Sequence, residues 1–219
     1  DSGTSEQQVS WEPDSAELTV AVSPVMAPVF AQLVEQFNRQ ELKTPDGVPP
    51  EASLWEKADK GWASDKAEAR VQRAVKIGLH ARFPHCRIKA EQPGKDGRTD
   101  IEVVGDFGVA PSASTNFAVL EMKVLREKGS GGRVYAPSAV ASHIKDGVNQ
   151  AYTYATDRSF RDRMLCCFDM RATNAGPDVV FSPVKDEANT LGVHLGYWFL
   201  YRSSEHYREC KVAAALKNG

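Results

Sequence analysis

The stretch that decides the fold is FAVLEMKVL, residues 117–125. It is apolar except for Glu121 and Lys123, as expected of a strand buried in a sheet. Residues two apart in a strand point to the same side, so Glu121 and Lys123 share one face. Burying two charged groups costs free energy unless each is paired, hydrogen-bonded or bound to a metal. We therefore expect a catalytic site on this strand.

Hydrophobic periodicity before and after this strand predicts the other elements of one α/β domain. In chain order we expect a helix over about 64–83, a hairpin of strands at 86–92 and 99–104, a helix over about 137–156, strands at 164–171 and 194–203, and a helical tail from 205. Residues 173–190 are expected to be a loop. This order predicts an α/β fold with a mixed central sheet flanked by helices.

The first fifty residues differ in pattern from the rest of the chain. Residues 16–24 suggest a strand, residues 28–40 an amphipathic helix, and residues 44–50 a linker rich in Pro and Gly. A strand and a helix alone are too small to fold independently. We expect an N-terminal appendage and linker at 1–50 and the main domain at 51–219. Ser53 and Glu56 have the spacing of a capping box, which predicts a short helix there.

The composition is that of an ordinary globular domain, with 219 residues, 42% hydrophobic and 26% charged. The formal net charge of −2 gives no overall attraction for nucleic acid, so any such function must depend on local chemistry. No apolar run reaches the roughly 18 residues of a membrane span, and residues 1–15 are polar, unlike the charged and then apolar pattern of a signal sequence. The four cysteines have no CxxC spacing. We expect a cytoplasmic protein with reduced thiols and no membrane contact.

Asp100 lies on the strand that precedes residues 117–125, where its carboxylate can meet that of Glu121. Two adjacent carboxylates repel each other unless a cation lies between them, and hard oxygen ligands favour Mg²⁺ or Mn²⁺. Such a metal can activate water and polarise a phosphate, while Lys123 can offset the negative charge that develops. Glu68, at the head of the preceding helix, is a candidate ligand for a second ion. Arg98 is a candidate phosphate contact.

These residues resemble the PD-(D/E)XK nuclease superfamily, which has an Asp followed by Glu-x-Lys on adjacent strands. The matching motifs are GRTD at 97–100 and EMK at 121–123, with Glu68 at the position of the carboxylate in the first helix of that family. QAYTY at 150–154 resembles the Q-x-x-x-Y motif of the RecB-like branch. The resemblance implies a restriction-endonuclease-like core and a metal-dependent deoxyribonuclease of defence, restriction or repair. It also implies that Gln150 and Tyr154 contact the substrate.

Two departures from the family pattern leave a ligand open. Thr99 stands where the family has Pro, and the interval between Asp100 and Glu121 is longer than in compact members. Glu102, on the same strand face as Asp100, is therefore an alternative ligand. Two other functions also stay open: a nuclease-like module that binds nucleic acid or a partner without cleaving, and an RNA-cleaving toxin. A homodimer is compatible with each of these functions.

Overall fold

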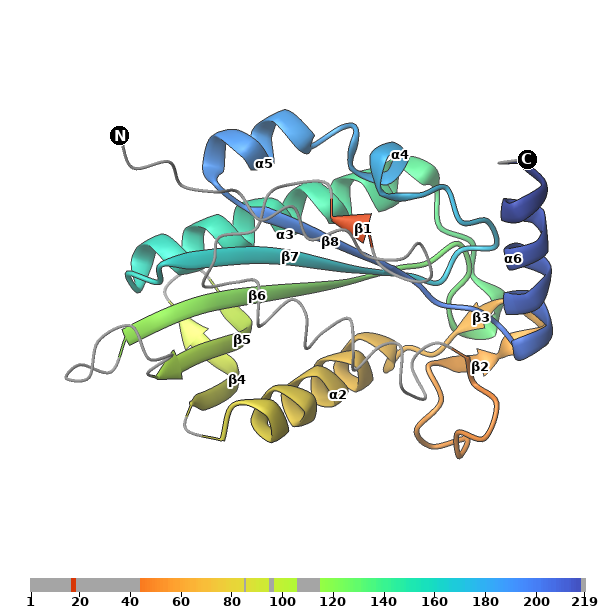
Figure 1. The fold of residues 1–219 in the computed structure, drawn as a ribbon, viewed down its shortest axis with the longest axis horizontal. Helices are drawn as coiled ribbons and strands as arrows, with labels where there is room; N and C mark the ends of the chain where they lie inside the picture. The colour runs from red at the N-terminus through yellow and green to blue at the C-terminus, as the bar shows by residue number, and fades with distance from the viewer. Residues whose placement is uncertain (1–16, 19–43, 85, 95–96, 106–114, 218–219) are drawn as a thin grey trace.

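The structure is a computed structural model, which describes residues 17–18, 44–84, 86–94, 97–105 and 115–217. Within these ranges, the side chains of residues 17–18, 91–99, 115 and 217 are outside the description. The described chain is an α/β fold with a mixed sheet between helices (Figure 1). The predicted fold class is confirmed at this level.

The elements follow the predicted order closely. The strands are β1 (Glu17–Leu18), β2 (Trp55–Lys57), β3 (Trp62–Ala63), β4 (Arg87–Gly94), β5 (Gly97–Gly105), β6 (Thr115–Leu125), β7 (Asp162–Asp169) and β8 (His194–Phe199). The helices are α2 (Ala67–Arg82), α3 (Pro137–Asp157), α4 (Pro177–Phe181), α5 (Lys185–Leu191) and α6 (Ser204–Lys217), with 3₁₀ turns η1 (Ala58–Lys60) and η2 (Ser130–Gly132).

The main sheet has the strand order β1-β8-β7-β6-β5-β4, and β2 and β3 form a separate hairpin. Strands β4, β5 and β6 pair antiparallel, whereas β6, β7 and β8 pair parallel. The parallel connections pass through α3 and through α4 with α5, as crossovers between parallel strands require. Strand β6 is therefore the position at which the sheet changes from antiparallel to parallel.

Helices cover both faces of the sheet, with α2 on one side and α3, α4 and α5 on the other (Figure 1). Alternate residues of β6 divide between the two cores. Leu120, Met122 and Val124 pack in the core that contains α2, and Leu125 packs in the core that contains α3. Because Glu121 and Lys123 alternate with the first group, they lie on the α3 face. The predicted helix α3 buries an apolar stripe of Val140, Ile144, Val148, Ala151 and Ala155.

Three local predictions were wrong. Residues 55–57 form β2 instead of a helix, because Leu54 and Trp55 are buried in the core and hold the segment extended. The predicted loop at 173–190 contains α4 and most of α5. Phe181 and Ala188 pack in the core between these helices and the sheet, which orders the segment. Helix α2 begins at Ala67 instead of near residue 64, and the Ser64 hydroxyl before it accepts hydrogen bonds from Lys66 N and Arg70 Nη1.

Little of the predicted N-terminal appendage can be compared with the structure. The two residues of β1 pair antiparallel with β8, which adds part of the first fifty residues to the main sheet. Within the expected linker, Asp46 Oδ2 accepts a hydrogen bond of 2.6 Å from Ser204 N at the start of α6. The helix expected at 28–40 lies outside the described residues. The domain boundary at residue 50 stays a prediction.

Candidate active site

The candidate site forms where β5 separates from β6. Their ladder pairs Ile101 with Leu120, and the next two positions are Asp100 and Glu121. Beyond this point the backbone N–H groups of β6 that face away from β7 donate hydrogen bonds to side chains instead of to a neighbouring strand. Met122 N donates to Asp100 Oδ2 at 2.7 Å, and Val124 N donates to Glu68 Oε2 at 3.3 Å. Two of the predicted carboxylates are thus held against the free edge of β6 by its own backbone.

Asp100 is also held from α2. Gln72 Nε2 donates to the backbone oxygen of Asp100 at 2.8 Å and to its Oδ1 at 3.3 Å. The Gln72 side chain is largely buried, so this contact has a fixed geometry. Gln72 was not among the predicted site residues. Its position one helical turn after Glu68, on the same face of α2, was the available signal.

Glu121 and Lys123 form a buried ion pair, with 2.7 Å between Lys123 Nζ and Glu121 Oε1. They are only 2% and 7% exposed. The other carboxylate oxygen, Glu121 Oε2, is buried and has no hydrogen-bond partner. A buried carboxylate oxygen without a donor is unfavourable, which makes this atom the feature of the site that most requires a ligand.

Gly147 brings α3 close to this pair. A Cβ atom at this position would lie 2.6 Å from Leu165 Cδ1 and 3.1 Å from Lys123 Cγ. Any other residue would therefore push α3 away from the sheet or displace Lys123. The glycine fixes the Lys123 chain between α3 and β6.

Glu68 and His143 meet beyond the end of β5, although they come from helices on opposite faces of the sheet. His143 Nε2 lies 3.6 Å from Glu68 Oε2, and both side chains remain partly exposed. They also line a cavity of about 360 Å³. This side of the candidate site is open to solvent, in contrast to the buried Glu121–Lys123 pair.

The pKa directions show an excess of negative charge. Burial and the neighbouring Asp100 carboxylate raise the pKa of Glu121 to about 8. Burial also raises the pKa of Asp100, against the opposing hydrogen bond from Met122 N. Burial alone would raise the pKa of Glu68, but His143 and Lys123 hold it below its usual value. Burial would lower the pKa of Lys123, and the Glu121 carboxylate reverses this effect.

A divalent cation would offset this excess of negative charge, because Lys123 is the lysine that interacts with the three acids Glu121, Glu68 and Asp100. The buried Glu121 Oε2 fits such an ion, because oxygen ligands are those that Mg²⁺ prefers. In the described part of the chain, however, no group of three or more His, Cys, Asp or Glu side chains is close enough to hold a metal. Asp100 and Glu121 would be the protein carboxylates at the ion, and Glu68 lies further off.

The other predicted site residues have different positions. Gln150 Oε1 is buried without a hydrogen-bond partner, one turn of α3 after Gly147. Tyr154 is 4% exposed, and its ring packs in the core with Val119 and Phe160. The structure therefore places Tyr154 in the interior, where a substrate contact would require rearrangement. The side chain of Arg98 lies outside the described residues.

Glu102 does not compete with Asp100 as a ligand. It is buried and forms an ion pair with Arg158, which begins the turn after α3. A carboxylate committed to a guanidinium has little remaining need for a cation. Of the two acids on β5, Asp100 is the one that adjoins Glu121.

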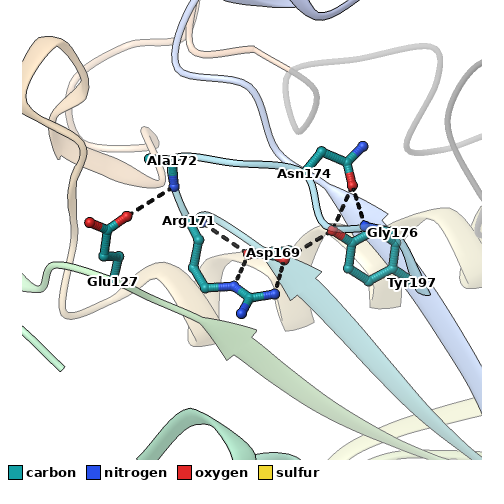
Figure 2. A network of polar contacts seen from close by, with 7 residues as sticks. All are labelled: Glu127, Asp169, Arg171, Ala172, Asn174, Gly176 and Tyr197. Carbon is teal, nitrogen blue, oxygen red and sulfur yellow. Dashed lines mark hydrogen bonds and ion pairs between the residues drawn. The ribbon is translucent and has the colours of Figure 1, made fainter. Parts of the chain in front are cut away.

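Another buried carboxylate, that of Asp169, belongs to a network of polar contacts at the end of β7 (Figure 2). Asp169 Oδ1 accepts hydrogen bonds from Arg171 N at 3.0 Å and Arg171 Nε at 2.9 Å. Asp169 Oδ2 accepts from Arg171 Nη2 at 2.6 Å and from the Tyr197 hydroxyl at 2.9 Å. Asn174 Oδ1 lies 2.9 Å from the same hydroxyl and accepts from Gly176 N. This network holds the loop between β7 and α4.

Comparisons of the chain with protein-family models, with curated proteins and with solved structures give no match. The candidate site therefore has to be interpreted from its own geometry. Among the helices of the described residues, none is long and apolar enough to span a bilayer. The cysteines at 86, 166, 167 and 210 form no disulfide bond.

Proposed function

We propose that the protein is a metal-dependent nuclease that hydrolyses DNA phosphodiester bonds, with a core like that of the PD-(D/E)XK nucleases. The proposal depends above all on Glu121, whose buried Oε2 has no partner and whose pKa is raised to about 8. A buried carboxylate oxygen without a hydrogen-bond donor costs stability, and a bound cation would remove that cost. It is the arrangement expected of a residue that binds a metal ion during function.

In the proposed mechanism, Asp100 and Glu121 would hold one Mg²⁺ or Mn²⁺ ion through their carboxylate oxygens. The bound ion supplies an activated water and polarises the phosphate. Lys123 holds the attacking water by its ammonium group and offsets the charge that develops on the phosphate oxygens. Gln72 would hold the Asp100 carboxylate in place by donating a hydrogen bond to its Oδ1. Glu68 orders further water at the open side of the site.

The direct test is digestion of supercoiled and linear DNA in Mg²⁺, in Mn²⁺ and in EDTA. We expect cleavage that needs the metal and that falls by about 100-fold or more in Lys123→Met and Asp100→Asn, the typical cost of removing one group that stabilises a transition state. Lys145→Met is the matched control, because Lys145 lies on α3 and its side chain is 59% exposed. Equal cutting by all four proteins would reject the proposal.

A second candidate function is binding of nucleic acid or a partner without cleavage. The observation in its favour is that no described group of three metal-ligating side chains is preformed. It predicts no heat of Mg²⁺ or Mn²⁺ binding in calorimetry, whereas the nuclease proposal predicts binding that is lost in Asp100→Asn. RNA of the same sequence, used as a second substrate in the digestion, tests the RNA-cleaving alternative.

A further inference from the structure

The cavity beside Glu68 has the composition of a nucleotide-binding site. Its volume is about 360 Å³, near the lower end of the range of about 300–1,000 Å³ that small-molecule sites occupy. Most of the lining is apolar, Arg126 and His143 are the basic residues that can attract phosphate, Glu68 contributes a carboxylate, and Tyr135 supplies an aromatic ring. The lining residues are Glu68, Val124, Leu125, Arg126, Tyr135, Ala139, Val140 and His143.

The aromatic ring of Tyr135 is held in place. A Cβ atom at Gly129 would lie 2.9 Å from the ring, so the glycine allows the backbone to pass close beside it. Tyr135 N also donates a hydrogen bond of 2.9 Å to Glu127 O, and the Arg133 guanidinium lies 5.5 Å from the ring centroid. Because the Arg133 guanidinium lies over one face of the ring, a base would stack on the part of the ring that lines the cavity.

The cavity also adjoins the proposed metal site. Glu68 connects the two, since it lines the cavity and accepts a hydrogen bond from Val124 N on β6, the strand that carries Glu121. Arg126 follows the end of β6 directly and lines the same space. A strand whose phosphate reached Asp100 and Glu121 would therefore place an adjacent nucleotide at this cavity.

We infer that the cavity receives one unpaired nucleotide of the DNA strand, next to the phosphate that is cleaved. This inference rests on the proposed function. A space of this size cannot hold a stacked base pair, so the nucleotide has to leave the duplex or come from a single strand. The base stacks on Tyr135 against the apolar wall of α3, and Arg126 faces its phosphate. The consequence is a preference for single-stranded or frayed DNA over blunt duplex.

The test is fluorescence anisotropy with a fluorescein-labelled 12-nucleotide DNA strand and the blunt duplex of the same sequence. Binding is measured in Mg²⁺ with the Lys123→Met protein, in which cleavage is removed, and again in EDTA with the unmodified protein. We expect the single strand to bind at least tenfold more tightly than the duplex. Equal affinities, or no binding of the single strand under either condition, would overturn the inference.

Variants of residues that line the cavity test whether single-stranded DNA binds there. Ala139→Trp fills the cavity from an exposed helix position, and Tyr135→Ala removes the ring. Both are expected to weaken single-strand binding by about fivefold to 100-fold, the range measured for the loss of one stacked base. The control is Val179→Trp, which adds the same bulk at an exposed position of α4 and should bind like the parent. Melting curves confirm that each variant is folded.

The two proposals can fail separately. DNA cleavage by Ala139→Trp at the parent rate would leave the nuclease proposal standing and reject the cavity as a nucleotide site. The opposite result is also possible. If the protein cuts no DNA with any metal but both cavity variants lose single-strand binding, the cavity is supported as a nucleotide site and the nuclease proposal is rejected.

Discussion

Two buried carboxylates on neighbouring parallel strands, Glu121 of β6 and Asp169 of β7, have opposite surroundings. Asp169 is fully buried, and both its oxygens accept hydrogen bonds from Arg171 or Tyr197 (Figure 2). Glu121 is almost as deeply buried, but only one of its oxygens is paired, with Lys123. Burial of an acid therefore does not by itself indicate function. The satisfied acid, Asp169, holds a loop in place, and the incompletely satisfied one, Glu121, is the acid to which we assign a ligand in the proposed function.

The number of cations explains the difference. Arg171 gives its guanidinium to Asp169 alone, through Nε and Nη2. Lys123 acts on three carboxylates at once, since Glu121, Glu68 and Asp100 each raise its pKa. One ammonium cannot neutralise three acids in a region of low dielectric constant, so Glu121 keeps a raised pKa.

The largest effect is expected at the satisfied acid. Asp169→Ala leaves Arg171 and the Tyr197 hydroxyl without their buried partner, and breaking such a pair costs about 3–5 kcal/mol of unfolding free energy. Urea or thermal denaturation measures the loss. Asp178→Ala is the control, because Asp178 lies in an ion pair on the surface and its side chain is 77% exposed. Similar losses for both variants would show that the Asp169 network does not stabilise the loop.

Next in size is the substitution Gly147→Ala. The new methyl group overlaps Leu165 Cδ1 and crowds Lys123, which we expect to cost about 1–2 kcal/mol and to reduce DNA cleavage as well. Adding Leu165→Val makes room and should restore part of both properties. Asp146→Ala, on the exposed side of α3, is the control. A Gly147→Ala protein with unchanged stability and cleavage would disprove the close packing of Lys123.

Substitution of Glu121 should change the unfolding free energy in the opposite direction. We expect Glu121→Gln to stabilise the metal-free protein. In the unfolded chain the pKa of Glu121 is near 4.5, and in the folded protein it is about 8. Between these values the unfolded state has lost the proton that the folded state keeps, so stability falls as pH rises through this window. Glutamine removes the effect. We expect a gain of about 1–2 kcal/mol that is absent near pH 4 and complete above pH 8.

A loss of stability in Glu121→Gln at pH 8–9, measured by denaturation in EDTA, would contradict this assignment. The same experiment on Asp169→Asn provides the contrast. Asp169 is already paired, so its neutral replacement should destabilise the protein at that pH.

The smallest effect is expected from the metal itself. Mg²⁺ competes with the proton on Glu121, so binding should strengthen as pH rises from 6 to 9. Differential scanning fluorimetry should show a melting temperature raised by a few degrees in Mg²⁺ at pH 9 and by less at pH 6. Glu121→Gln should lose this dependence. A shift of equal size at both pH values would mean that the ion binds elsewhere.

Local pattern predicted the strands that build the site, for reasons that particular residues illustrate. The apolar run around Glu121 and Lys123 could form only a buried strand, and the alternation of residues placed both side chains on one face. Hydrophobic spacing likewise predicted α3 and its buried stripe. Pattern failed where packing overrides local preference. Trp55 is in an extended segment in spite of a capping-box spacing, and Phe181 orders a helix in a stretch of Pro and Gly.

The sequence by itself determined which residues carry charge on a buried strand, because side-chain alternation and the cost of burying charge are local properties. Only the tertiary structure decided how those charges are satisfied. In the folded protein Glu102 forms an ion pair with Arg158, and Asp100 accepts hydrogen bonds from Gln72 and from the β6 backbone. Glu121 Oε2 has no donor. The tertiary structure also placed the ring of Tyr154 in the core. Pairing depends on which distant groups meet in space, and one strand's sequence does not contain that information.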